Sequence, residues 1–220
     1  MKRTALVAGA TGLIGGHVIN LLIDNPAYEK VIAISRRPLG IQHEKLDNRL
    51  IDFDQLEQAD DLFHVDSVFC CLGTTMKKAQ SQEAFRVVDY EYPLSLGRMA
   101  KKHGVNNFLL VSSMGANAHS SIFYSRVKGE LEEQLIRLDL PKLFVFRPSL
   151  LLGNRQEFRL GEKAGEWLAK PLSALLIGQW RKYRPIEAAR VAEAMVAADQ
   201  SDSHAKIKVY ESHQIAEVTR

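Results

Sequence analysis

Tyr124 and Lys128 are the residues whose types and spacing best suit acid–base chemistry in this sequence. The segment from Phe123 to Leu138 has the apolar periodicity of a helix, so residues four positions apart share one face. An ammonium near a phenol stabilises the tyrosinate, which makes proton exchange with a carbonyl or alcohol feasible near neutral pH. Ser113 could hold the substrate oxygen. We therefore predict Ser113, Tyr124 and Lys128 as catalytic residues; the alternative is a surface tyrosine beside a lysine that extends into solvent.

A glycine-rich turn lies near the N-terminus, with the spacing Gly-x-x-Gly-x-x-Gly. It follows an apolar strand and opens a helix that ends near Pro26. Glycine permits a sharp turn and the close approach of a pyrophosphate, while free N–H groups at the positive end of the helix favour its charge. The alternative is a tight strand–helix turn without a ligand. In this context we predict a dinucleotide site whose residues include Gly9, Thr11, Gly12, Leu13, Ile14 and Gly15.

Two arginines, Arg36 and Arg37, stand where domains selective for NAD(H) carry an acid, about twenty residues beyond the turn. Guanidinium groups bind a 2′-phosphate that a carboxylate would repel, so the sequence favours NADP(H), with NAD(H) second. The alternative is a pair of solvated arginines before Pro38. Asp52 and Phe53 end the expected third strand. There the acid could accept the adenine amino group while the backbone supports the ring, or Asp52 is an ordinary strand-end aspartate.

Short apolar runs rich in β-branched residues alternate with amphipathic segments as far as Pro148. Strands buried on both faces and separated by helices predict an α/β fold, a Rossmann-type doubly wound parallel sheet. We expect one NAD(P)-binding domain over residues 1–220, in which residues 149–220 form a small, mostly helical C-terminal lobe on the substrate side, with a helix at Ile186–Ala198. The expected strands are Ala5–Ala8, Val31–Ser35, Leu50–Phe53, Ser67–Leu72, Phe108–Ser112 and Leu143–Phe146.

Composition narrows the range of partners. The 220 residues carry a net charge of +3, and the basic residues are scattered instead of forming one dense run, so we expect no nucleic-acid partner. Gly9 and Gly12 interrupt the first apolar segment too early for a signal peptide or a membrane span. A cytoplasmic protein without a membrane partner is therefore expected. The histidines show no helical or zinc-like spacing, so no metal is expected.

Together these features resemble the short-chain dehydrogenase/reductase superfamily from the first strand through Arg147-Pro148, and the glycine spacing is that of its extended and atypical branches. More closely, several segments are similar to the atypical Tat-interacting-protein subfamily of oxidoreductases and its bacterial relatives. The resemblance extends into the C-terminal tail. These segments are Cys70–Thr75, Val111–Ala116, Tyr124–Glu130, Phe146–Pro148, Asn154–Glu157 and Gly161–Glu162.

The resemblance implies a set of cofactor contacts. Leu72, Gly73 and Thr74 would line the ribose side of the cofactor, and the backbone after Pro148 would meet the nicotinamide. Two departures concern the proton relay. Asp89 stands where many relatives have asparagine, and the loop before Tyr124 is short for the superfamily. Ser112, Tyr124 and Lys128 complete the expected cofactor-binding residues.

Three functions are compatible with these residues. The first is an NADP(H)-dependent oxidoreductase that moves hydride to or from a small carbonyl or alcohol of unknown identity. The second is a non-catalytic NADP(H)-binding sensor or interaction protein, which would bind cofactor without turnover and could have a protein partner. A nucleotide-sugar epimerase or dehydratase is third, because the tail is small for its substrate lobe. Oligomeric state stays open, with residues 82–103 and 122–138 as the faces to test. Substrate contacts in the tail could come from Arg155, Arg159 and Trp167, although surface charge and packing are the ordinary roles of such residues.

Overall fold

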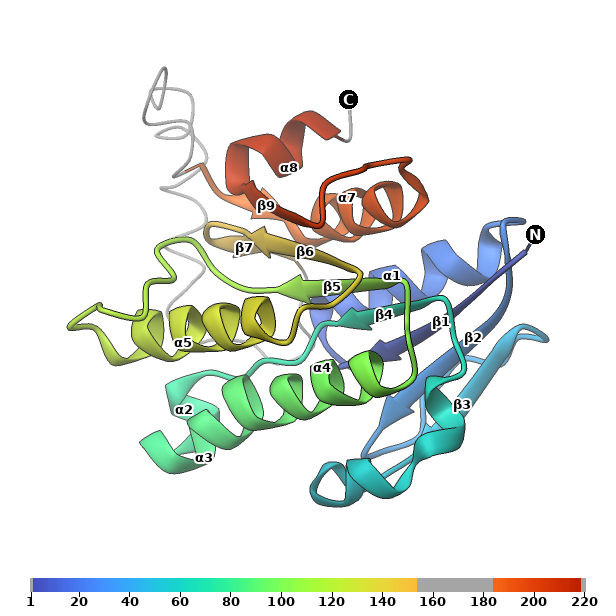
Figure 1. Ribbon diagram of the computed structural model, residues 1–220, viewed down its shortest axis with the longest axis horizontal. Helices are drawn as coiled ribbons and strands as arrows, with labels where there is room; N and C mark the ends of the chain where they lie inside the picture. Colours follow the sequence, from blue (N-terminus) through green and yellow to red (C-terminus); the bar gives the residue numbers. More distant parts are fainter. Residues whose placement is uncertain (1, 154–183, 219–220) are drawn as a thin grey trace.

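The computed structural model describes residues 2–153 and 184–218 (Figure 1). Its main sheet has seven strands in the order β3-β2-β1-β4-β5-β6-β9, and every neighbouring pair is parallel. This topology confirms the predicted Rossmann-type α/β fold. The strands are β1 (Arg3–Ala8), β2 (Tyr28–Ser35), β3 (Leu46–Leu50), β4 (Ser67–Cys70), β5 (Asn107–Val111), β6 (Lys142–Arg147) and β9 (Ile207–Glu211).

Helices cover both faces of the sheet, and each face has its own apolar core. Helices α1 (Leu13–Asp24) and α7 (Ala188–Gln200) pack against one face, while α4 (Tyr92–Lys102) and α5 (Phe123–Arg137) cover the other (Figure 1). Central strands must then be apolar on both sides, and β1 is, because Ala5–Ala8 is fully buried.

Shorter elements connect these layers. The 3-10 helices η1 and η2 and the helices α2 and α3 precede α4, and a π turn, η3, joins α3 to α4. Two short strands form a separate parallel pair. Within residues 2–153 and 184–218, none of the helices has the length and apolar character needed to cross a membrane. The bounds are η1 (Phe53–Gln58), η2 (Asp60–Phe63), α2 (Met76–Ala79), α3 (Gln82–Arg86), η3 (Val87–Glu91), β7 (Leu151–Leu152), β8 (Ile186–Glu187) and α8 (Ser212–Val218).

The third strand lies earlier than predicted, at Leu46–Leu50 instead of Leu50–Phe53. It is an edge strand whose sequence, Leu-Asp-Asn-Arg-Leu, is partly exposed along its length, so it lacks the apolar run expected of a central strand. The apolar signal that suggested the later position comes from Phe53, which is buried at the start of η1.

The described part of the C-terminal tail contributes directly to the main sheet. Helix α7, close to the predicted Ile186–Ala198, packs against α1. Strand β9, which the sequence analysis did not identify, pairs with β6 from Leu143↔Ile207 to Arg147↔Glu211. Its first residues, Ile207 and Lys208, are exposed, as befits a strand at the sheet edge.

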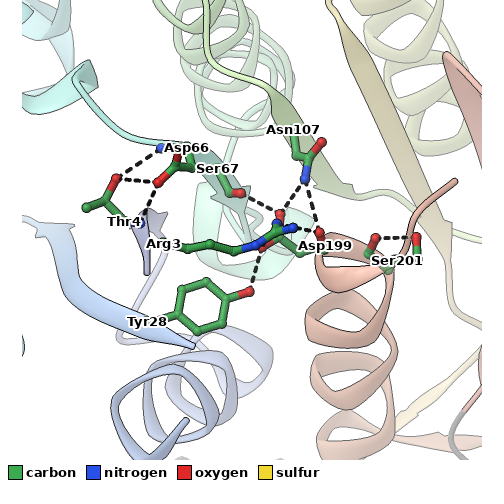
Figure 2. Close-up of polar contacts among 9 residues, drawn as sticks. Arg3, Thr4, Tyr28, Asp66, Ser67, Asn107, Asp199 and Ser201 are labelled. Atoms are coloured by element: carbon green, nitrogen blue, oxygen red, sulfur yellow. Dashed lines mark hydrogen bonds and ion pairs between the residues drawn. The ribbon is translucent and has the colours of Figure 1, made fainter. Parts of the chain in front are cut away.

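A buried polar cluster fixes α7 to the amino edge of the sheet (Figure 2). Asp199, near the end of α7, is fully buried. Its carboxylate accepts hydrogen bonds from the Tyr28 hydroxyl at 2.5 Å, the Asn107 amide at 2.8 Å and the Ser67 hydroxyl, and lies 3.2 Å from the Arg3 guanidinium. These four donors are the first residues of β2, β5, β4 and β1. The cluster therefore lies opposite the carboxyl edge, which carries the glycine-rich turn.

Candidate functional site

The glycine-rich turn leaves β1 at the point where the strand order reverses, between β1 and β4. Gly9 has a φ of +85°, a left-handed conformation that glycine adopts without strain. A Cβ at Gly9 would lie 2.5 Å from the Cys71 carbonyl oxygen. The Gly12 N–H donates to the Gly9 carbonyl at 2.9 Å and closes the turn. Ligands of open α/β sheets bind at such a reversal point, at the carboxyl ends of the strands.

Helix α1 begins directly after this turn with its first N–H groups uncapped by any side chain. Gly12 is its N-cap, with a φ of −81°, and no acidic residue lies in the first turn. A Cβ at Gly15 would come within 2.2 Å of the Gly9 carbonyl oxygen, so the helix approaches the strand more closely than a side chain allows. The N-terminus of α1 thus combines the positive end of a helix with a backbone that a pyrophosphate can approach.

Arg36 and Arg37 follow β2 at the same edge, and both are exposed. In the part of the chain that the structure describes, neither guanidinium pairs with a carboxylate. Hydrogen bonds hold the backbone of their loop: the Ser35 hydroxyl donates to the Arg37 carbonyl at 2.7 Å and accepts from the Asn48 amide at 3.0 Å. The loop is therefore held in place while its two cations are free to meet an anion.

Asp52 and Phe53 do not end a strand, as the sequence analysis expected, but begin η1. Asp52 is exposed and caps that helix by accepting from the Asp54 N–H at 3.1 Å. The Phe53 ring is buried, with its centroid 5.3 Å from that of Tyr92. Tyr92 donates to Asp54 at 2.8 Å, and burial, reinforced by that carboxylate, raises the pKa of Tyr92 to about 12. Contact of Asp52 and Phe53 with an adenine stays a prediction.

The loop after β5 holds Ser113 beside the segment that follows β6. The Met114 N–H donates to the Pro148 carbonyl at 2.9 Å. The Ser113 hydroxyl oxygen is buried and has no hydrogen-bond partner among the described residues. The hydroxyl can therefore hydrogen-bond a group that comes from outside these residues, such as a substrate oxygen. Gly129 lets this loop close against α5, because a Cβ there would lie 2.2 Å from the Ala118 backbone nitrogen.

Tyr124 and Lys128 lie one turn apart in α5, as predicted, but differ in burial. Tyr124 is 37% exposed, with its ring centroid 5.6 Å from that of Phe85. Lys128 is 3% exposed, and its Nζ lies 2.8 Å from Asp89 Oδ1. Burial alone would lower the pKa of Lys128, but the charges of Asp89 and Tyr124 raise the pKa of Lys128 above its ordinary value. The lysine is therefore an ammonium ion at neutral pH.

The loop after β4 meets this ion pair. The Thr74 N–H donates to Asp89 Oδ2 at 2.7 Å, and a Cβ at Gly73 would lie 3.5 Å from Asp89 Oδ1. The structure thus brings Gly73, Thr74 and Lys128 together around Asp89, and the contact of Leu72, Gly73 and Thr74 with a cofactor stays a prediction. The tail residues Arg155, Arg159 and Trp167 lie outside the described residues, as do Asn154–Glu157 and Gly161–Glu162.

One charged network beside this site was missed by the sequence analysis. Glu132, buried in α5, accepts from the Arg147 guanidinium and from the Ser112 hydroxyl. Arg147 also bonds Glu211 of β9 at 3.0 Å, and hydrogen bonding to Glu132 raises the pKa of Arg147. A possible signal was Glu132 itself, a carboxylate four residues after Lys128 on the buried face of a helix. The network holds the ends of β5 and β6, from which Ser113 and Pro148 continue.

The sheet order, the glycine turn at the reversal point and the uncapped α1 terminus define an NAD(P)-binding domain of the short-chain dehydrogenase/reductase type. Comparison with known families agrees: residues 5–131 match the model described as the NAD dependent epimerase/dehydratase family. The chain belongs to this family.

The relatives confirm the closer resemblance to the Tat-interacting-protein subfamily. The chain is 34% identical to Protein HTATIP2 of Rattus norvegicus, over 97% of this chain and 88% of the relative. It is 32% identical to Protein FMP52-1, mitochondrial, of Scheffersomyces stipitis, over 98% of both chains. Among solved structures, the Bordetella bronchiseptica enzyme WbmH in complex with NAD+ superposes with a TM-score of 0.73 at 16% identity, over 96% of this chain and 75% of that one. At that identity the likeness shows the fold.

The expectation of a cytoplasmic location is contradicted by these relatives. FMP52 proteins from several fungi, including Scheffersomyces stipitis and Candida albicans, are named mitochondrial. The sequence criterion was the lack of a long apolar segment, and this criterion does not distinguish one aqueous compartment from another.

Proposed function

We propose that the chain is an NADP(H)-dependent oxidoreductase that transfers hydride to or from a small carbonyl or alcohol substrate, with Tyr124 as the acid–base residue. One observation carries the proposal. The unpartnered Ser113 hydroxyl and the Tyr124–Lys128 turn of α5 belong to the same carboxyl edge as the glycine turn. This edge is where ligands of doubly wound sheets bind.

The roles of the residues follow from their chemistry. NADPH, when bound, supplies the hydride that the carbonyl carbon receives. Ser113 holds the substrate oxygen through its free hydroxyl, and Tyr124 donates the proton that converts this oxygen into the alcohol. The Lys128 ammonium stabilises the tyrosinate that remains, and the partial exposure of Tyr124 lets water return the proton. The uncapped N-terminus of α1 would hold the pyrophosphate, and Arg36 and Arg37 would hold the 2′-phosphate.

Cofactor choice is tested by calorimetry. The unmodified protein should bind NADPH at least tenfold more tightly than NADH, a difference of about 1.4 kcal/mol. Replacing Arg36 and Arg37 together with alanine should remove this preference by weakening NADPH alone. The matched control is the double alanine variant of Lys101 and Lys102. It removes the same charge from the last turn of α4, near the amino ends of the strands. Equal affinities for NADPH and NADH in the unmodified protein would refute the assignment.

Turnover is tested by NADPH consumption against a panel of carbonyl compounds. Tyr124→Phe should lower kcat on the order of a hundredfold or more, the range for loss of a general acid, and leave the NADPH affinity nearly unchanged. Tyr90→Phe is the matched control, because the Tyr90 ring stacks with Arg86 at 4.1 Å through its face. NADPH binding without any turnover would favour a non-catalytic binding protein. Conversion of a nucleotide sugar such as UDP-glucose would favour an epimerase.

A further inference from the structure

Asp89 bridges two segments that come from different parts of the chain. Its carboxylate is buried, with 1% of the residue exposed. One oxygen lies 2.8 Å from the Lys128 ammonium in α5, and the other accepts the Thr74 N–H at 2.7 Å, in the loop after β4. Both partners are donors, and both belong to the edge where the dinucleotide is proposed to bind.

Pro93 explains why Asp89 lies in a π turn. Proline has no N–H, so Pro93 cannot donate to the carbonyl of Asp89, four residues earlier. The helix responds by widening, and the Tyr92 N–H donates to the Val87 carbonyl, five residues back. A π turn changes the direction of the side chains that it carries, and such turns are frequent at functional sites. Here, Asp89 is the buried residue of the turn.

We propose that Asp89 is a positioning residue that holds the Lys128 ammonium and the Thr74 loop as one unit at the proposed dinucleotide site. The inference rests on the proposed function, because it assigns both segments to the cofactor site. The carboxylate offers one oxygen to each donor, whereas an asparagine in the same place would turn its amide NH2 group toward one of them, so only one of these two contacts would be kept.

Charge gives the pair a second property. The groups that act on Lys128 are Asp89, Tyr124 and Cys70, and burial opposes all three. Without the Asp89 charge, burial would dominate and lower the pKa of Lys128. A neutral Lys128 would then be a weaker donor to the cofactor at alkaline pH. Loss of Asp89 should therefore weaken dinucleotide binding in a way that depends on pH.

The experiment measures NADPH affinity by calorimetry at pH 6 and pH 9. Asp89→Asn should bind NADPH at least tenfold more weakly at pH 9, relative to the unmodified protein, and approach its affinity at pH 6. Lys128→Met should bind NADPH weakly at both pH values, and the double variant of Asp89→Asn and Lys128→Met should bind NADPH no more weakly than Lys128→Met alone. Asp47→Asn is the control, since Asp47 of the edge strand β3 forms ion pairs with Lys30 of β2 and Arg49 of β3, away from Asp89. A loss in Asp89→Asn that is the same at both pH values would overturn the inference.

Failure of the dinucleotide site itself has a different signature, since the unmodified protein would then bind no dinucleotide, whereas failure of catalysis alone leaves these affinities measurable. In that case, urea unfolding of the same variants still tests whether Asp89 holds Lys128 and the Thr74 loop together. Asp89→Asn should be less stable than the unmodified protein, and this deficit should shrink from pH 6 to pH 9, because the buried lysine can shed its proton in the folded state. The double variant should lack this pH dependence. A deficit that stays constant with pH overturns the proposed bridge.

Discussion

Replacing Asp199 with alanine should destabilise the fold more than any single change at the cofactor edge. The carboxylate accepts from Tyr28, Ser67 and Asn107, three donors that are nine-tenths or more buried. Each buried donor left without a partner costs about 1 to 3 kcal/mol, and although Asn107 keeps a bond to the Asp199 main-chain carbonyl at 3.2 Å, the loss should be roughly 3 kcal/mol or more. Arg3 is one-third exposed, and its ion pair adds little because water replaces it. A loss of this size is a large part of an ordinary unfolding free energy, which is about 5–15 kcal/mol.

Urea unfolding at pH 7, followed by circular dichroism, measures this loss. Tyr28→Phe is the graded control, because it removes one donor and leaves the carboxylate its other partners, so it should cost about 1 kcal/mol. NADPH affinity of folded Asp199→Ala should stay near that of the unmodified protein, since the cluster lies at the amino edge of the sheet. A cost below about 1 kcal/mol for Asp199→Ala would refute the reasoning, because water would then be satisfying all the donors.

Four further outcomes follow from the structure. Gly73→Ala should leave the unfolding free energy nearly unchanged, because its Cβ would lie 3.5 Å from the nearest atom, yet calorimetry should show NADPH binding weakened at least tenfold. Gly9→Ala should destabilise the protein by about 2 kcal/mol or more, because φ is positive there and the Cβ would lie 2.5 Å from a carbonyl oxygen. Burial, reinforced by Asp199, raises the pKa of Tyr28 well above its ordinary value. The contribution of this hydroxyl is therefore complete below pH 10 and is lost above it, and urea unfolding should show the unmodified protein losing about 1.4 kcal/mol more per pH unit above pH 10 than Tyr28→Phe. Glu132→Gln should cost about 1.5–3 kcal/mol in the same assay, because Arg147 loses its charged acceptor.

The positions of Gly9, Tyr124 and Lys128 could be predicted because each depends on a local pattern. A glycine at a strand exit is recognised within a few residues, and so is a residue pair at helical spacing. Strand β3 was harder to predict, because edge strands lack the apolar run that marks central strands. Strand β9 was missed for the same reason, since its first residues are exposed.

Contacts between distant segments could not be predicted in the same way. Arg147 and Glu132 are 15 residues apart, Arg147 and Glu211 are 64 apart, and Ser67 and Asp199 are 132 apart. Taken alone, each of these polar or charged residues is of a type that usually lies at the surface. Only the strand order brings them together, and the strand order is a property of the whole chain.

Asp89 lies between these two cases, because its pairing is distant but its direction has a local cause. A proline four residues after an acid, inside a segment with helical periodicity, removes the N–H that the carbonyl of the acid would use. The helix must kink or widen at that point, and a widened turn shifts the side chains after it relative to a regular helix. The spacing of Asp89 and Pro93 therefore predicts an irregular turn at this acid from sequence alone. Its burial follows once α5 packs beside the turn, and the only cation that meets it among the described residues is Lys128. Asp89→Asn, which keeps Pro93, should therefore keep the irregular turn and lose the ion pair with Lys128.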